Sequence, residues 1–297
     1  MIIKQKNGAA RSDAKSLAQI HIAVFFLGLS ALAGKWSGQS ALALTFGRVW
    51  ISAPALFLYI KLRRQPIRLR AGRDYGVMAA LGLLWALHWV AFLQSTQMAT
   101  VAIATITFAT YPVFVTFLEP WFFHERLRLG AVLQALLMLF GAAIIVPWQV
   151  GGGLLPGFAW GMLASVLHAA IVLLNRRMVA DYSGEVVAFY SQAAAALLLL
   201  PAGLILRPVF AGRDLAAVLM LGLLCSALAQ ALMGRGLQRV KAQTLALIGG
   251  LESVYGILLA AVLLGQPPTR RETIGGAIVL GVSMYVTLQK QAARADV

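Results

Sequence analysis

Long apolar runs, separated by short polar or charged stretches, follow one another along almost the whole chain. Each run is about 20 residues long, the length that an α-helix needs to cross the hydrocarbon core of a bilayer. The runs do not alternate between polar and apolar residues, as the strands of a membrane β-barrel do. Because a backbone in lipid must satisfy its own hydrogen bonds, the pattern predicts an all-α membrane protein with ten transmembrane helices. The predicted spans are 17–37, 42–61, 74–97, 100–118, 128–146, 156–176, 185–206, 214–234, 243–264 and 272–289.

The composition supports a membrane protein. Only 12% of the 297 residues are charged and 60% are hydrophobic, whereas soluble domains carry roughly 25% charged residues. The first apolar run follows several basic residues, and Ala31 and Ala33 form the small-residue pattern of a signal-peptide cleavage site. The stretch 17–36 is nevertheless long enough to span a bilayer and has a counterpart in the second half. We therefore expect it to be a retained first helix.

The net charge of +15 could suggest nucleic-acid binding, but its distribution indicates membrane topology instead. With the N-terminus inside, 19 of the 25 Lys and Arg residues lie in cytoplasmic segments, including the run KLRRQPIRLRAGR at 61–73. This positive-inside bias predicts that both termini are cytoplasmic. We expect this chain to be embedded in the lipid bilayer and to bind no nucleic acid.

The chain repeats itself at an offset of 140 or 141 residues. LGLLWALHWV at 81–90 returns as LGLLCSALAQ at 221–230, and YPVF at 111–114 falls on ESVY at 252–255. The pattern predicts a duplicated five-helix unit, and because five is odd, the second copy must enter the membrane from the opposite side. The predicted division is a cytoplasmic tail at 1–16, a first repeat at 17–146, an outer linker at 147–155, a second repeat at 156–289 and a cytoplasmic tail at 290–297.

Several short motifs resemble those of one transporter superfamily. They are TYPVF at 110–114, FFHE at 122–125, LLGQP at 263–267 and IGGAIVLGV at 274–282. In this order they resemble the drug/metabolite transporter superfamily, in its ten-helix branch of paired EamA-type repeats, and most closely the YddG-type bacterial aromatic amino-acid exporters. The resemblance implies helices around a central cavity, lined mainly by spans one, three, four, six, eight and nine, in a bacterial inner membrane. Gln266 departs from the pattern, because the family often has Glu there.

Positions at which the two copies carry different residues are candidates for binding a ligand that lacks two-fold symmetry. Glu252 is the only carboxylate predicted near the middle of a span, nine residues into span nine. Ionisable groups at that depth are costly and point to function, so Glu252 could bind an ammonium group or carry a proton; alternatively, it is a structural acid. The full set of candidate substrate-binding residues is Trp85, His88, Trp89, Tyr111, His168, Gln230, Glu252 and Ser253.

Two histidines and two tryptophans stand within the predicted spans. His88 and His168 could titrate or bind substrate, or each could bridge two helices as a neutral side chain; we expect them to be isolated from one another. Trp85 and His88 share a helical face, with Trp89 at its edge. These rings could stack on an aromatic substrate or hold an ammonium group, or they could pack toward lipid.

Two further candidates depend on local geometry. Tyr111 precedes Pro112 at the centre of span four, where a proline frees a backbone carbonyl and kinks the helix. The kink could serve a gate or a ligand, or it could be purely structural. Gln230 could hydrogen-bond the substrate or the facing helix.

The distribution of cations narrows the substrate class. Lys35 and Arg48 lie near the outer ends of the first two predicted helices, and no Lys or Arg falls at the middle of a span. Phosphorylated substrates usually require fixed positive charge, so a neutral or zwitterionic substrate is favoured. We expect a monomeric secondary transporter that exports neutral, aromatic amino acids and related small metabolites by alternating access.

Other functions remain open. One is the export of other drugs or metabolites within the same superfamily. Another is an integral membrane enzyme, which would need nucleophile–base pairs or histidine clusters that the sequence does not present. A channel-like subunit is a third. The single cysteine, Cys225, cannot build a Cys-based metal site, and we expect no cofactor and no metal.

Overall fold

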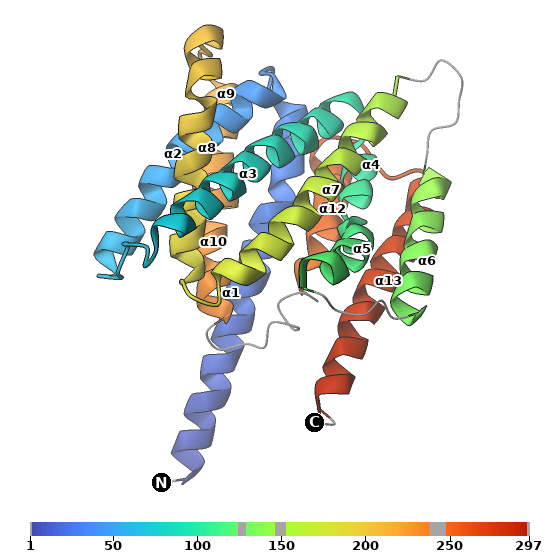
Figure 1. The fold of residues 1–297 in the computed structure, drawn as a ribbon. Coiled ribbons are helices and arrows are strands. Elements are labelled where there is room, and N and C mark those ends of the chain that lie inside the picture. The colour runs from blue at the N-terminus through green and yellow to red at the C-terminus, as the bar shows by residue number, and fades with distance from the viewer. Residues whose placement is uncertain (1, 124–128, 146–152, 238–247, 296–297) are drawn as a thin grey trace.

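The computed structural model of the protein describes residues 2–123, 129–145, 153–237 and 248–295. Throughout these residues the regular structure is helical, in one bundle from which α1 and α13 project at the same end (Figure 1). Seven helical stretches are long and apolar enough to cross a membrane, and α6 and α12 are shorter apolar helices. The helices are α1 (Ile2–Trp36), α2 (Ala41–Leu62), α3 (Gly72–Met98), α4 (Val101–Phe108), α5 (Tyr111–Phe123), α6 (Leu129–Ile145), α7 (Leu155–Met178), α8 (Gly184–Leu206), α9 (Arg213–Leu219), the π-helix η1 (Met220–Leu228), α10 (Ala229–Leu237), α12 (Leu251–Leu263) and α13 (Arg270–Ala295).

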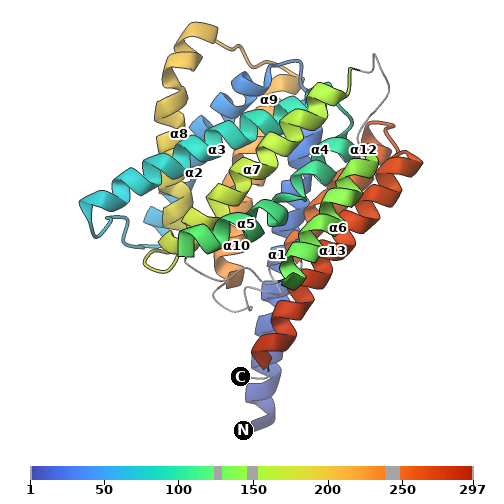
Figure 2. The same cartoon turned by 45° about the vertical axis from the view of Figure 1, so that its right-hand side comes forward.

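Helices from the two halves of the chain interlock. Helix α1, from the first half of the chain, packs mainly against η1, α10 and α12 of the second half. Helix α7, from the second half, packs mainly against α3, α4 and α5 of the first half. The helices α2 and α8 pack against each other, as do α6 and α13, which lie side by side at one edge of the bundle in both views (Figure 2). The first helix of each predicted repeat therefore belongs, by its contacts, to the other half.

Two glycines at equivalent places let helices approach closely. A Cβ on Gly82 of α3 would lie 2.7 Å from the carbonyl oxygen of Ser191 on α8. A Cβ on Gly222 of η1 would lie 2.6 Å from Cβ of Ile51 on α2. Glycine removes the side chain that would hold the backbones apart. Gly82 and Gly222 are 140 positions apart, and so are Ile51 and Ser191, so one close contact recurs at the equivalent position.

Span four is two helices, because its backbone breaks at Ala109 and Thr110 between α4 and α5. The predicted kink thus lies just before Pro112, which sits in the first turn of α5. Proline has no N–H, so the Phe108 carbonyl four residues earlier loses its helical partner. That carbonyl instead accepts a hydrogen bond from Ser165 Oγ of α7 at 3.3 Å. The break in the chain is therefore held by the facing helix.

Span nine also departs from a single continuous helix over 243–264, because a turn at Gly250 precedes α12. Gly250 stands 141 positions after Ala109, so the described turn occupies the place that corresponds to the break in span four. The beginning of the predicted span lies outside the described residues. Glu252 is consequently in the first turn of α12, rather than nine residues into an unbroken helix. Interruption of corresponding spans by glycine or proline is typical of transporter binding sites.

Candidate functional site

Seven rings from four helices pack together beside the break in span four. Their centroids lie between 4.8 and 6.2 Å from at least one other member. We call this set the ring cluster. It consists of Trp85, His88, Trp89 and Phe92 of α3, Phe108 of α4, Tyr111 of α5 and His168 of α7. Five of the eight candidate residues therefore meet in one place.

His168 lies at the centre of the ring cluster. Its ring centroid is 4.9 Å from those of His88, Phe108 and Tyr111, and 5.6 Å from that of Trp85. The expectation that His88 and His168 are isolated from one another is therefore wrong. They are far apart in the sequence, but the packing of α3 on α7 brings their rings into contact.

The two histidines differ in their hydrogen bonds. His88 Nδ1 lies 2.9 Å from the carbonyl oxygen of Ala164 on α7, so this nitrogen carries the donated proton and a neutral His88 keeps Nε2 as an acceptor. His88 thus bridges two helices. His168 Nδ1 is buried and has no hydrogen-bond partner among the described residues. A buried polar atom without a partner is costly, and a ligand or water molecule can satisfy it.

The tryptophans of α3 form one wall of the ring cluster. Trp85 and Trp89 stack with their centroids 4.8 Å apart and their planes 30° apart. Trp89 is only 4% exposed, so it packs inside the protein and not toward lipid. Trp85 is half-buried and contacts both histidines. Their stacking and burial define an aromatic surface on which a flat apolar group can pack.

Three candidates lie outside the ring cluster. Ser253 is buried and donates its hydroxyl hydrogen to the carbonyl oxygen of Thr105 at 3.1 Å, a contact that joins α12 to α4. Gln230 is half-buried in α10, and its side chain makes no hydrogen bond within the described part of the chain. Glu252 is half-buried in the first turn of α12, where its backbone carbonyl faces Gly28 of α1.

Arg48, which we expected near the outer end of span two, has its side chain buried beside the ring cluster. Arg48 is 3% exposed, and its guanidinium carbon lies 4.3 Å from the ring centroid of Trp89. Arg48 is the eighth of the 22 residues of α2, so its backbone lies between one end of the helix and its middle. The long side chain, however, runs into the bundle, where it meets Ser30 of α1 and Ser226 of η1.

The sequence analysis missed Phe92, Phe108, Arg48 and Ser226. Phe92 follows His88 by four residues and so shares its helical face, which is a signal that could have been used. Arg48 was named only as a residue near the outer end of span two, and its place as the lone charge within the apolar run ALALTFGRVWISAPALFLYI is a signal that could have made it a candidate. Phe108 and Ser226 carry no such signal, because phenylalanine and serine are both common in membrane helices.

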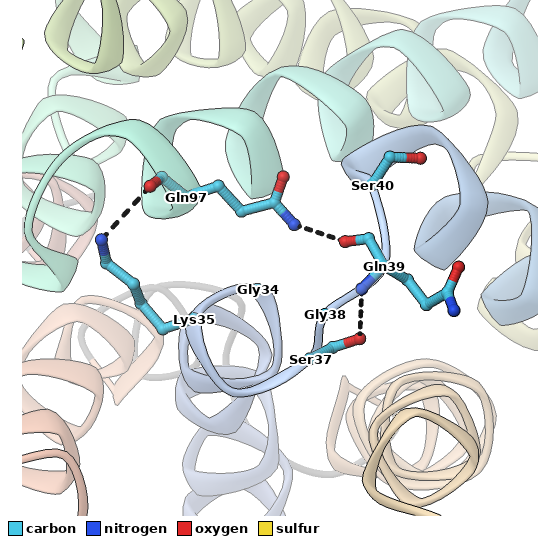
Figure 3. A pocket seen from close by; sticks show the side chains of 7 residues that line it. All are labelled: Gly34, Lys35, Ser37, Gly38, Gln39, Ser40 and Gln97. Carbon is cyan, nitrogen blue, oxygen red and sulfur yellow. Dashed lines mark hydrogen bonds between the residues drawn. The ribbon is translucent and has the colours of Figure 1, made fainter. Parts of the chain in front are cut away.

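The larger of the two described pockets lies elsewhere, at the turn between α1 and α2 (Figure 3). It has a volume of about 420 Å³, and its rim is tied together by hydrogen bonds from Lys35 Nζ to the Gln97 carbonyl at 3.3 Å and from Gln97 Nε2 to the Gln39 carbonyl at 2.8 Å. The second pocket lies between α6 and α13. None of the eight candidate residues lines either pocket. The ring cluster therefore lines neither of these two pockets, although the side chains of Trp85, Tyr111 and His168 are only half-buried.

Apolar helices packed around a buried group of aromatic and ionisable side chains define a multi-pass membrane protein. The family model described as the EamA-like transporter family matches residues 15–146 and again 155–288. The chain belongs to this family. As a member of this family, the protein is a membrane transporter of small molecules.

Individual relatives agree with this class. The chain is 30% identical over 229 residues to a probable biotin transporter of Pseudomonas aeruginosa, with 74% of this chain and 80% of the relative covered. It is 23% identical over 232 residues to the uncharacterized transporter YxxF of Bacillus subtilis, with 76% and 73% covered. A solved crystal structure superposes with a TM-score of 0.67 on 94% of this chain and 99% of its own, at 20% identity, which shows a shared fold.

Proposed function

We propose that this protein is a secondary transporter that exports neutral amino acids with aromatic side chains, and related small metabolites, by alternating access. The observation that carries the proposal is the ring cluster, which gathers aromatic and imidazole rings at the break between α4 and α5. Broken helices expose backbone groups to a ligand, and aromatic surfaces stack on flat apolar side chains. His168 Nδ1 supplies a polar contact at that surface, and Glu252 in the first turn of α12 is the acid that binds a substrate ammonium group or carries a proton.

The proposal includes the architecture that such transport requires. The chain forms ten transmembrane helices in two inverted repeats, 17–146 and 156–289, with a linker at 147–155 and tails at 1–16 and 290–297. The matches of the family model to two successive stretches support this division, and so does the recurrence of the Gly82 contact at Gly222. The protein acts as a monomer in a bacterial inner membrane, with both termini cytoplasmic.

Alternating access assigns a role to the interlocked helices. Because α1 packs on the second half and α7 on the first, a rocking movement of one half changes the contacts of both. In this conformation His88 and Trp89 are buried, whereas Trp85 and His168 are half-buried, so a substrate would meet the latter two rings first. Opening requires the α4–α5 break and the Gly250 turn to act as hinges.

A second substrate is favoured by one relative, the probable biotin transporter that is 30% identical to this chain. Biotin combines a planar ureido ring, fused to a saturated thiolane ring, with a carboxylate on an alkyl chain. The ring cluster can receive the rings, and Arg48 stands beside Trp89 as a cation. Transport of biotin is therefore the alternative to transport of aromatic amino acids.

Counterflow in liposomes tests the proposal. Purified protein is reconstituted into vesicles that are loaded in turn with tryptophan, phenylalanine, leucine, threonine, biotin or a sugar phosphate, and labelled phenylalanine or biotin is added outside. We expect the label to accumulate when the vesicles hold an aromatic amino acid, and not when they hold the sugar phosphate. Trp85→Leu should lose this accumulation, whereas Trp121→Leu should keep it, because Trp121 is 76% exposed and away from the ring cluster. Accumulation with biotin loading alone would replace the amino-acid proposal with the alternative.

A further inference from the structure

We propose that Arg48 anchors a carboxylate group of the transported molecule, at the place where α1, α2, α3 and η1 meet. The inference rests on the proposed transport function, since it names the chemical group by which the same site recognises its substrate. Neither the family nor the relatives' names assign a role to Arg48.

The guanidinium of Arg48 is fixed in orientation by three contacts. Its Nε donates to Ser226 Oγ at 2.6 Å, and its Nη1 donates to Ser30 Oγ at 3.0 Å. Its face lies over the indole of Trp89, with the central carbon 4.3 Å from the ring centroid. A planar cation that is held on two edges and one face is already oriented for a ligand before binding.

Ser226 is itself positioned by the π-helix. Its hydroxyl donates to the Leu221 carbonyl at 2.8 Å, five residues earlier, which is the spacing of the η1 backbone. The equivalent stretch of the first half, 81–88, is ordinary α-helix within α3. Single π-helical turns inside longer helices often occur at functional sites. The two copies of the repeat therefore differ in backbone geometry at Ser226, the residue of η1 that contacts Arg48.

Arg48 has no ionic partner among the described residues. Within the described part of the chain, the salt bridges join Arg70 to Asp181, Arg73 to Asp74 and Arg176 to Glu119. Glu252 is not among the acids that make these salt bridges. Two serine hydroxyls provide hydrogen bonds without neutralising the charge. A buried cation in this state is costly to keep, and an anionic ligand would supply the missing charge.

The surroundings favour a carboxylate over a phosphate. A guanidinium has five N–H groups in a planar fork that matches the two oxygens of a carboxylate. One guanidinium balances the single charge of a carboxylate but not the charge of a doubly charged phosphate. Trp89 belongs both to the contacts of Arg48 and to the ring cluster. A carboxylate bound at Arg48 therefore places the rest of the molecule against the rings.

Matched ligands that differ only in the carboxylate test this inference. The pairs are phenylalanine with phenylalaninamide and biotin with biotinamide, and each is measured by thermal stabilisation of the purified protein and by counterflow. The variants are Arg48→Gln, Arg48→Lys and Ser226→Ala. The control is Arg176→Gln, because Arg176 pairs with Glu119 and its side chain is 50% exposed.

We expect the wild-type protein to bind the acid of at least one pair and to discriminate against its amide. Arg48→Gln should weaken binding of that acid by about 10- to 100-fold, the loss typical of a charge-assisted hydrogen bond, and should leave binding of the amide unchanged. Arg48→Lys should retain part of the affinity, since lysine keeps the charge but not the fork. The melting temperature of ligand-free Arg48→Gln should be no lower than that of the wild type, because the variant removes an unpaired buried charge.

Three results would overturn the carboxylate anchor. They are equal binding of acid and amide by the wild type, an equal loss of both in Arg48→Gln, and a lower melting temperature of that variant with acid binding retained. If acids and amides are transported equally well, the anchor falls while the transport function stands. If folded protein neither binds nor transports any member of any pair, both proposals fall together.

Discussion

Ser52 of α2 donates a hydrogen bond to Gln192 of α8, and these two residues stand 140 positions apart. By the offset that relates the two halves of the chain, each is the counterpart of the other. Both side chains are almost completely buried. A residue can meet its own counterpart only where the two halves face one another across a local two-fold relation. The pair thus marks the centre of the interface between α2 and α8.

Ser52→Ala should lower the melting temperature of the purified protein. Gln192 Nε2 already lacks a partner among the described residues, and the substitution would leave Oε1 without one as well. An orphaned buried polar group costs about 1–3 kcal/mol. Replacing both partners, in Ser52→Ala with Gln192→Leu, should recover part of the loss, because no polar group is then stranded. A double variant less stable than either single variant would contradict this explanation.

Gly82→Ala should destabilise the protein, because its new methyl group would lie 2.6 Å from Cβ of Ala194 and 2.7 Å from the Ser191 carbonyl oxygen. Overpacking of this kind typically costs about 1–3 kcal/mol. Gly76→Ala is a matched control on the same helix, since nothing lies within 4 Å of its Cβ position. Thermal unfolding of both variants checks the prediction. Equal melting temperatures would show that α3 and α8 do not pack this closely.

The positions of the membrane helices could be predicted from the sequence, because bilayer thickness fixes the length of an apolar run. The span at 42–61 appears as α2 (Ala41–Leu62), and the span at 185–206 appears as α8 (Gly184–Leu206). The breaks within spans were harder to place. The backbone breaks before Pro112 because the Phe108 carbonyl finds its partner on α7, and that contact has no local signature.

Part of the candidate site could also be predicted. Aromatic and ionisable residues within apolar runs are conspicuous, and this signal found Trp85, His88, Tyr111 and His168, which the fold gathers together. Arg48 was misplaced because helical position gives the depth of a backbone, not of a long side chain. Its partners come from α1 and η1, and only the packing of the helices identifies them.

Glu252→Gln should weaken transport severalfold without changing the melting temperature or the elution profile of the purified protein. Glu252 is half-buried and makes no salt bridge within the described residues, so its charge is available to a substrate ammonium group or a proton. Counterflow measures the effect. The matched control is Glu119→Gln, which removes an acid that pairs with Arg176. Unchanged transport in Glu252→Gln would remove this residue from the site.

The contact between Tyr182 and Asp74 should depend on pH only under alkaline conditions. Burial, together with the hydrogen bond that the phenol donates to the Asp74 carboxylate at 2.5 Å, raises the pKa of Tyr182 above its ordinary value of 10.0. The stabilisation is therefore fully present below about pH 10 and is lost as the pH rises through the higher folded-state pKa. The difference in melting temperature between the wild type and Tyr182→Phe should be constant from pH 6 to about pH 9 and should shrink above pH 10. A difference that already shrinks near neutral pH would contradict this assignment.

Substrate protection of a cysteine in the ring cluster tests most directly whether that cluster is the transport site. In a Cys225→Ala background, which removes the only native cysteine, Trp85→Cys is labelled with a water-soluble thiol reagent in reconstituted vesicles. Trp121→Cys on the exposed face of α5 serves as the control. We predict that Trp85→Cys reacts when the site opens and that a transported substrate slows its reaction severalfold, while labelling of Trp121→Cys does not change. A Trp85→Cys that is inert, or that reacts equally fast with and without a transported substrate, would contradict a transport site in the ring cluster.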